Sequence, residues 1–510
     1  MAKEIKGSSS TGPQNIEDAL EALGGFGKFQ ALVLFLILFM ELPTAMLIFL
    51  PVFIGKNPSE WLCDNVTVTK TEACECMGNV TPVDDSVSIV AEWNLICESS
   101  WVSDTIVTVQ MSGMILGKIL ASQACDWYGR KKSFVGVLVL MTLGSITTAV
   151  APNPYVYGGA RFVCGASFSG FLGITSVYSM EFLTPGWRAW SSGLSPMGIG
   201  IMTLGILAYL IRTWRTLVWA TLLPFFGIVF ILPFLPESPR WLLRNNKITE
   251  GHKVFNYIAR LNNRDPLDIE TLRCIAEKER PKTLENSNEE VKQFSYLDFF
   301  RNKQLLKTTL CLQCVWFTCG LVYFGISFNI KNLSGDPYMN VVYMGLMDFI
   351  GYPGSSFLLM KLSRRKSLVA LMSLSAVFLV AMAILQITLE MSNYKYILAI
   401  LCFLGKLSIG GARCVLRVFS GESFPTAIRS MGLGVSSGAI SFGGMLAPQL
   451  AYLGDSSPSL PFFVFAVVSV LGSLVSFLLA ESDGKPLQEE VRTKQASHKK
   501  PEVITVASVC

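Results

Sequence analysis

The sequence predicts an all-α membrane protein whose twelve transmembrane helices form two pseudo-symmetric bundles of six. Hydrophobic residues make up 51% of the 510 residues and charged residues only 15%, fewer than the surfaces of soluble domains require. The apolar residues fall into blocks of about 20, the length at which a helix crosses a bilayer core of about 30 Å. A charged turn also recurs at matching places in the two halves of the chain, which indicates a duplicated unit.

The apolar blocks set the expected domain organisation. The regions are a cytosolic N-terminus at 1–27, an N-terminal six-helix bundle at 28–235 with an extracellular loop at 55–100, a cytosolic helical insert at 236–305, a C-terminal six-helix bundle at 306–480 and a cytosolic tail at 481–510. The expected spans lie at 28–54, 102–124, 134–151, 155–178, 190–210, 216–235, 306–330, 338–361, 367–389, 395–419, 430–452 and 460–480.

The distribution of lysine and arginine predicts the orientation of the chain in the membrane. The turns at 125–133 and 361–366 are rich in both residues, and so is the insert, whereas the loop at 55–100 contains only two lysines. Cytosolic loops carry the excess of positive residues, so both termini, the insert and the basic turns are expected in the cytosol. Arg212 and Arg215 lie on the opposite side and depart from this statistical rule.

The extracellular loop has the residues of an oxidised and glycosylated segment. Four of the 13 cysteines lie in it, namely Cys63, Cys74, Cys76 and Cys97. Cys74 and Cys76 are too close in sequence to be expected to bond each other, so each should pair with one of the outer two, in an order left open. A zinc site is the alternative, disfavoured because no histidine is near. Asn65 and Asn79 begin glycosylation sequons.

Charged corners follow the second, fourth and sixth spans of each half. Glu181 precedes Arg188 by seven residues, and Glu422 precedes Arg429 by the same spacing. Ion pairs at such corners can hold one face of a two-domain carrier closed and then release it, whereas the alternative is that they only fix topology and cap helices. The candidate gate residues are Asp126, Arg130, Glu181, Arg188, Glu237, Arg364, Glu422 and Arg429.

Several of these segments resemble the signatures of the major facilitator superfamily, in particular its organic cation, anion and zwitterion transporters. They are "SIVAEWNLIC", "ASQACDWYGRKKS", "VYSMEFLTPGWR", "PESPRWLL" and "GESFPTAIRSMG". The second half is most similar to the carnitine and novel organic cation branch. The resemblance implies a central cavity that opens alternately to each side of the plasma membrane and carries cations or zwitterions such as carnitine. The alternatives are an organic anion carrier and a non-transporting ligand sensor.

The resemblance also implies where a substrate binds. Trp316, Phe317 and Tyr323 match aromatic residues of the family's pocket, and aromatic faces attract quaternary ammonium groups. Asp348 matches an acid that the cation carriers keep there, and is the expected ammonium partner. Ser441 stands where cation carriers tend to have Asp and anion and carnitine carriers Arg, so the charge that sorts substrates is missing. Without the resemblance, membrane aromatics of this kind are usually core or lipid-facing.

Two arginines in the tenth span suggest that the sorting charge has moved. Arg413 and Arg417 are four residues apart and share a helix face. The carnitine branch has uncharged residues at both places. Charges within a bilayer are costly and need partners, so these arginines either face a substrate carboxylate or are neutralised by Glu41 or Asp348.

Other kinds of chemistry are disfavoured by what the sequence contains. The two histidines lie in the insert and the tail, away from the spans, so a histidine proton relay across the membrane is not expected. No metal cluster, catalytic triad or nucleotide-binding motif is recognisable, so neither an enzyme nor a cofactor is predicted, and no nucleic-acid partner. The expected partners are a small organic ion, the lipid bilayer and, where transport is coupled, sodium or a proton.

Overall fold

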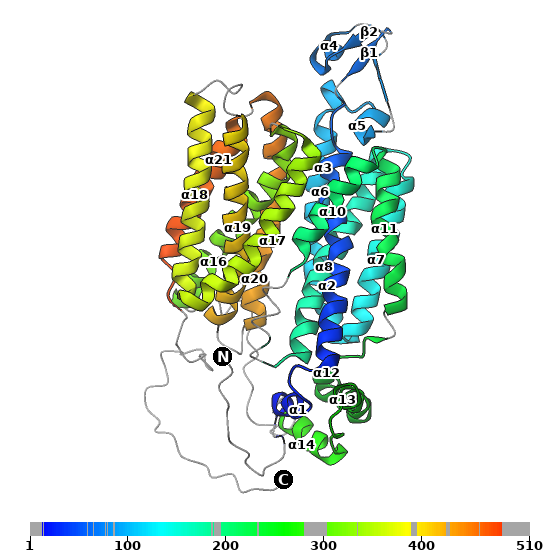
Figure 1. The fold of residues 1–510 in the computed structure, drawn as a ribbon, viewed down its shortest axis with the longest axis vertical. Coiled ribbons are helices and arrows are strands. Elements are labelled where there is room, and N and C mark those ends of the chain that lie inside the picture. Colours follow the sequence, from blue (N-terminus) through cyan, green and yellow to red (C-terminus); the bar gives the residue numbers. More distant parts are fainter. Residues whose placement is uncertain are drawn as a thin grey trace.

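The structure is a computed structural model with two helical bundles standing side by side (Figure 1). It describes residues 13, 15–58, 60–64, 66–76, 78, 80–84, 87–184, 187, 195–231, 234–279, 303–333, 335–388, 395–424, 429–457 and 459–481. In Figure 1 the N-terminal bundle runs from blue to green and the C-terminal bundle from lime green to red.

Within the described residues, each expected span contains one long helix. In the N-terminal half these are α2 (Lys28–Phe49, continued by α3, Pro51–Ile54), α6 (Trp101–Tyr128), α7 (Arg130–Val150), α8 (Pro154–Phe182), α10 (Met197–Leu210) and α11 (Trp214–Ile231). In the C-terminal half they are α16 (Lys303–Phe328), α17 (Pro337–Lys361), α18 (Arg364–Thr388), α19 (Lys395–Ser423), α20 (Arg429–Ser456) and α21 (Ser459–Phe477). The fold class predicted from the sequence is confirmed.

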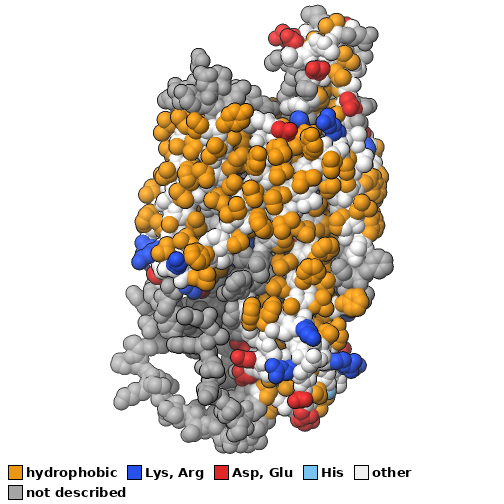
Figure 2. All heavy atoms as spheres, viewed as in Figure 1, with side chains coloured by type: hydrophobic (Ala, Val, Ile, Leu, Met, Phe, Trp, Pro, Cys, Tyr) orange, Lys and Arg blue, Asp and Glu red, His pale blue; other side chains and the backbone are white. Residues whose placement is uncertain are grey.

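The outer surface of the bundles is suited to lipid. Eight of the described helices are individually long and apolar enough to cross a membrane, and α10 is apolar but shorter. Hydrophobic side chains cover the visible face of both bundles, and charged side chains gather beyond the two ends of this belt (Figure 2). Exposed leucines, valines and phenylalanines are stable there because hydrocarbon, not water, is their solvent, while helices satisfy every backbone polar group internally.

One end of the bundles carries the loop at 55–100, and we call it the loop end. Three short antiparallel strands form a sheet there in the order β2 (Val66–Val68), β1 (Trp61–Cys63), β3 (Val80–Pro82), next to α4 (Lys70–Glu75). Disulfides join Cys63 to Cys76 and Cys74 to Cys97, so the expectation that Cys74 and Cys76 do not bond each other is confirmed. Both sequon asparagines, Asn65 and Asn79, lie outside the described residues.

The end of this loop is fixed to the N-terminal bundle by an ion pair. Glu92, the last residue of α5 (Ile89–Glu92), accepts hydrogen bonds from Trp214 Nε1 at 2.8 Å and Arg215 Nη2 at 2.5 Å. Arg215 also donates to the carbonyls of Ala149 and Ala151. The charge of Arg215 is therefore compensated by an acid and by two carbonyls at the end of a helix. This compensation explains how a positive residue can lie at the loop end, against the statistical rule.

The opposite end, which we call the basic end, carries a layer of short helices. The helices α12 (Pro239–Arg244), α13 (Ile248–Asn262) and α14 (Ile269–Glu279) follow the sixth span, and α1 (Ile16–Ala22) lies beside them (Figure 1). Asn262 ties the layer to the first span, because its side chain accepts from Phe29 N and donates to Leu23 O, both at 2.9 Å. The expected helices of the insert are thus present, while residues 280–302 and 482–510 lie outside the described part.

Candidate functional site

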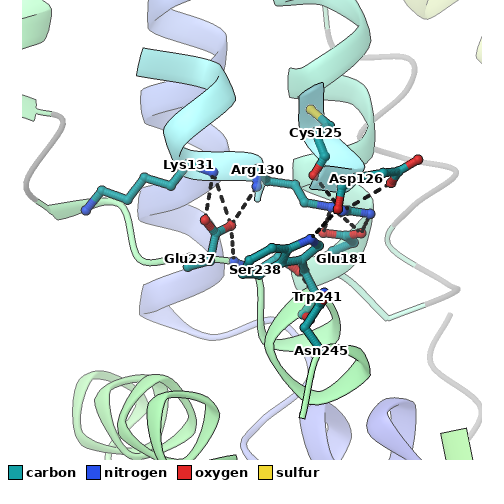
Figure 3. A network of polar contacts seen from close by, with 9 residues as sticks. All are labelled: Cys125, Asp126, Arg130, Lys131, Glu181, Glu237, Ser238, Trp241 and Asn245. Carbon is teal, nitrogen blue, oxygen red and sulfur yellow. Dashed lines mark hydrogen bonds and ion pairs between the residues drawn. The ribbon is translucent and has the colours of Figure 1, made fainter. Parts of the chain in front are cut away.

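The corner after the second span is a compact polar network at the basic end (Figure 3). Arg130 begins α7 and donates through Nε to Glu181 Oε1 at 3.0 Å, near the end of α8. The Nη1 of Arg130 lies 3.3 Å from Asp126 Oδ1, on the last turn of α6. This arginine therefore joins three helices of the N-terminal half.

A second acid caps the first turn of α7. Glu237 Oε1 accepts the backbone N–H of Arg130 at 2.8 Å and of Lys131 at 3.1 Å (Figure 3). A carboxylate at this position satisfies unpaired donors and interacts favourably with the helix dipole. Gly129, between α6 and α7, has φ +97, and a Cβ there would lie 2.4 Å from Glu237 Oε2, so the turn requires glycine.

The C-terminal half builds the same corner from equivalent residues. Arg364 begins α18, and its Nε lies 3.2 Å from Glu422 Oε2 at the end of α19. Glu481 takes the place of Glu237, accepting from Arg365 N at 3.2 Å and from Ser363 Oγ at 2.6 Å. The prediction that the two halves have matching corners is confirmed. Glu481 was not among the expected gate residues, although its position in the repeated segment after the twelfth span was a signal for it.

These corner contacts lie within each half and do not join the halves. Each corner ion pair links two helices of one bundle. Arg188 lies outside the described residues, and Arg429 begins α20 with a side chain that is not described. The gate role of the eight corner residues therefore remains a proposal, and the contacts that are present brace each bundle.

The halves meet toward the loop end. Gln449 Nε2, near the end of α20, donates to Thr108 Oγ1 of α6 at 2.9 Å. The rings of Phe53 and Tyr338 stack at 5.4 Å between α3 and α17. Along α19, by contrast, Lys406 is 0% exposed, Arg413 is 8% exposed and Arg417, nearest the basic end, is exposed. The interface is therefore closed at the loop end, and exposure increases toward the basic end.

Two glycines allow the halves to touch backbone to backbone. A Cβ on Gly198 of α10 would lie 2.5 Å from the carbonyl oxygen of Gly345 on α17, and a Cβ on Gly345 would lie 2.6 Å from that of Gly198. Close helix approach of this kind depends on small residues. The state in which the loop end is closed thus requires glycine at both places.

Gly345→Ala is expected to slow transport at least about tenfold, because the added methyl group separates α10 and α17 and disfavours the state closed at the loop end. Uptake per molecule of protein at the membrane would measure this effect. Gly354→Ala on the same helix is the matched control, because nothing lies within 4 Å of a Cβ there. Equal rates in both variants would contradict a role for the contact.

The centre of the C-terminal half holds a buried cluster around Tyr323 of α16. The Tyr323 hydroxyl donates to Asp348 Oδ2 of α17 at 2.7 Å. Lys406 Nζ of α19 lies 3.8 Å from the same oxygen and 3.1 Å from the centre of the Tyr323 ring. The Arg413 guanidinium lies 4.0 Å from that ring centre. The Tyr323 ring thus contacts two cationic groups, and the Asp348 carboxylate pairs with one of them, Lys406.

Arg413 extends this cluster to the other half of the molecule. It hydrogen-bonds the hydroxyl of Tyr352 on α17, and its Nη2 lies 3.6 Å from the sulfur of Met197 at the start of α10. A cation that touches both halves can respond to their relative motion. Neither Tyr352 nor Met197 was expected from the sequence, since an isolated tyrosine or methionine in a span carries no distinguishing pattern.

The structure brings together only part of the expected binding set. Tyr323, Asp348 and Arg413 are in one cluster, and Trp316 lies on the same helix as Tyr323 and donates through Nε1 to Ser420 at 3.0 Å. Phe317 is half-buried. Ser441 is buried, and in the described part of the chain it makes no polar contact with Tyr323, Asp348 or Arg413. Arg417 is exposed between the halves, where it interacts electrostatically with Glu41 of α2 and Lys118 of α6.

The partner of Asp348 is the main surprise of the site. The sequence suggested a substrate ammonium as that partner, whereas the side chain of Lys406 lies in that place. Both residues are ionisable and lie within spans, and charges in a membrane tend to pair. That rule was the signal available in the sequence for this contact.

Comparisons with known proteins agree on one family. The family described as "Sugar (and other) transporter" matches residues 65–492. The organic cation transporter protein of Drosophila melanogaster is 32% identical over 421 residues, covering 81% of this chain and 75% of that one. Human organic cation/carnitine transporter 2 is 28% identical over 427 residues, with 81% and 73% covered.

Solved structures agree on the fold. An inward open conformation of the xylose transporter XylE from E. coli, a major facilitator superfamily protein, has a TM-score of 0.61 at 15% identity. The match covers 90% of this chain and 98% of that one. At this identity the likeness shows the fold alone.

Proposed function

The chain belongs to the sugar (and other) transporter family of the major facilitator superfamily, among its organic ion transporters, and from that premise we propose that it carries small organic cations or zwitterions. It is a membrane transporter that works by alternating access, and not an enzyme. Similar proteins are named for organic cations and for carnitine.

The Tyr323 cluster is the observation that supports this substrate class. An ammonium group is recognised by an aromatic face together with a carboxylate. Tyr323 and Asp348 provide both, and they already hold cationic groups of the protein at 3.1 Å and 4.0 Å from the ring centre. We propose that a substrate ammonium takes the place of one of these groups during the transport cycle, with Trp316 and Phe317 on the same helix.

An organic anion is the second candidate, favoured by the positive charge between the halves. Lys118 and Arg417 repel each other electrostatically there, and Arg417 is exposed. Ser441 leaves the eleventh span neutral at the place that sorts charge in the resembling family. This candidate requires a substrate with a carboxylate or sulfate group and a net negative charge.

We further propose that the protein lies in the plasma membrane with the basic end and both termini in the cytosol. The disulfides of the loop support an oxidising environment at the opposite end. Lysine and arginine at the basic end support a cytosolic location there. A sodium or proton gradient is the proposed source of coupling.

Uptake into proteoliposomes tests the substrate class. Labelled carnitine and tetraethylammonium are expected to accumulate faster than in protein-free vesicles, and replacing sodium by potassium or removing the pH gradient identifies the coupling ion. Accumulation of estrone sulfate alone would establish the anion carrier instead. Saturable binding of carnitine without accumulation would indicate a sensor and overturn the proposal.

A further inference from the structure

One face of α19 carries a row of three cations at different depths. Lys406, Arg413 and Arg417 are spaced by seven and four residues, which places them along one side of a helix. Lys406 is compensated by Asp348 at 3.8 Å. In the part of the chain that the structure describes, neither of the two arginines nearer the basic end forms an ion pair of this kind.

Arg413 is buried with an unused donor. It is 8% exposed, and its Nε has no hydrogen-bond partner among the described residues. Its other contacts are the Tyr323 ring, the Tyr352 hydroxyl and the Met197 sulfur, and none of these carries a negative charge. A guanidinium has five N–H donors, and leaving one unpaired in a buried site is costly.

Arg417 faces charges of both signs across the interface. It makes no ion pair or hydrogen bond in the part of the chain that the structure describes, and it is exposed. Lys118 of α6 and Glu41 of α2 both interact with it electrostatically from the N-terminal half. Glu41 accepts a hydrogen bond from Ser195 at 2.9 Å and forms no direct ion pair with either arginine within the described residues.

Among the described residues, positive charge therefore exceeds negative charge beside the two arginines. Arg413 and Arg417 carry two positive charges, while one acid, Glu41, interacts with both of them. Arginine binds carboxylates through two parallel N–H donors, a geometry for which the unused Nε of Arg413 is available. The missing component is an anion of about carboxylate size.

We propose that Arg413 and Arg417 of α19, with Lys118 of α6 opposite, form the subsite that binds the carboxylate of a transported zwitterion. The assignment rests on the proposed transport function. Tyr323 and Asp348, farther from the basic end, are left for the ammonium group of the same molecule. Glu41 interacts with both arginines without pairing directly with either, so it competes weakly with the substrate carboxylate for them.

The subsite also links binding to closure at the basic end. Lys118 belongs to the N-terminal half and Arg417 to the C-terminal half, so these like charges repel each other across the interface. A bound carboxylate attracts both sides and removes this repulsion. The empty carrier is thereby held open at the basic end, and the loaded carrier is free to close.

Equilibrium binding in nanodiscs tests the subsite with two ligands that differ in one group. Carnitine has an ammonium and a carboxylate, whereas its methyl ester keeps the ammonium and loses the negative charge. The wild-type protein should bind carnitine at least about tenfold more tightly than the ester. Arg417→Gln and Lys118→Met should each reduce this preference while ester binding persists. Arg260→Gln, an exposed arginine of α13, is the matched control and should keep it.

A third variant tests the same idea in the opposite direction and does not depend on removing an arginine. Glu41→Gln removes the competing acid, so carnitine should bind several-fold more tightly, with the ester unchanged. The subsite is overturned if Arg417→Gln weakens both ligands equally, or if Glu41→Gln leaves the preference as it was. A preference for carnitine without any accumulation in vesicles would contradict transport but support the subsite. Accumulation without a preference would support transport but contradict the subsite.

Discussion

Asp348→Asn should abolish uptake of cationic and anionic substrates alike and greatly reduce the amount of folded protein. Asp348 and Lys406 are both 0% exposed, with Nζ and Oδ2 3.8 Å apart. Removing the acid leaves a buried ammonium without its counterion, and breaking a buried pair in this way typically costs about 3–5 kcal/mol. The double variant Asp348→Asn/Lys406→Met, which removes both charges, should recover much of the folded protein.

The measurement for this pair separates folding from recognition. Fluorescence-detected size-exclusion chromatography gives the folded fraction of each variant, and uptake is then expressed per folded molecule. Asp336→Asn is the matched control, since this exposed acid caps the start of the same helix by accepting from Tyr338 N at 2.8 Å. Normal amounts of folded Asp348→Asn with loss of cation uptake alone would contradict the role of Asp348 as the counterion that Lys406 needs, and would leave its role toward the substrate ammonium.

The twelve helices were predictable because hydropathy is a local property of the chain. A block of apolar residues must cross the bilayer as a helix whatever its neighbours are. The matching corners were predictable for a similar reason, since the repeat places the same acid and base after equivalent spans. The same contact forms in both halves, between Glu181 and Arg130 in one and between Glu422 and Arg364 in the other.

The sheet in the loop and the pairing of its cysteines were not predictable in the same way. Each strand has three residues, too few for an alternating pattern to stand out. Four cysteines allow three pairings, and spacing excludes only the bond between Cys74 and Cys76. Which of the remaining two pairings forms depends on how β1 and α4 pack, a tertiary property.

The individual charges of the central site were predictable, but their partners were not. Charged residues within a span stand out, so Asp348, Arg413 and Arg417 were identified. Their partners lie on other helices, and for Arg413 one contact, Met197, lies in the other half of the molecule. A contact between halves depends on the conformational state of the carrier, which a sequence does not specify.

Glu181→Gln should destabilise the protein much more than the equivalent change Glu422→Gln. The side chains of Arg130 and Glu181 are 11% and 12% exposed, whereas those of Arg364 and Glu422 are 30% and 28% exposed. Loss of one partner from the more buried pair should cost about 3 kcal/mol, and from the more exposed pair about 1 kcal/mol. Thermal unfolding of each purified variant measures the difference, with Glu270→Gln on α14 as a control whose ion pair is more than half exposed.

Transport by the same two variants decides between a brace and a gate. If the corner pairs only brace each bundle, uptake per folded molecule should stay near wild type in Glu422→Gln, because the bundle still moves as one body. If Glu422 also takes part in a gate when the basic end closes, uptake should slow in this variant although its stability is nearly unchanged. The structure shows both pairs formed inside each half, so the brace requires no contact between the halves. Equal destabilisation by Glu181→Gln and Glu422→Gln would contradict the difference in burial from which the prediction starts.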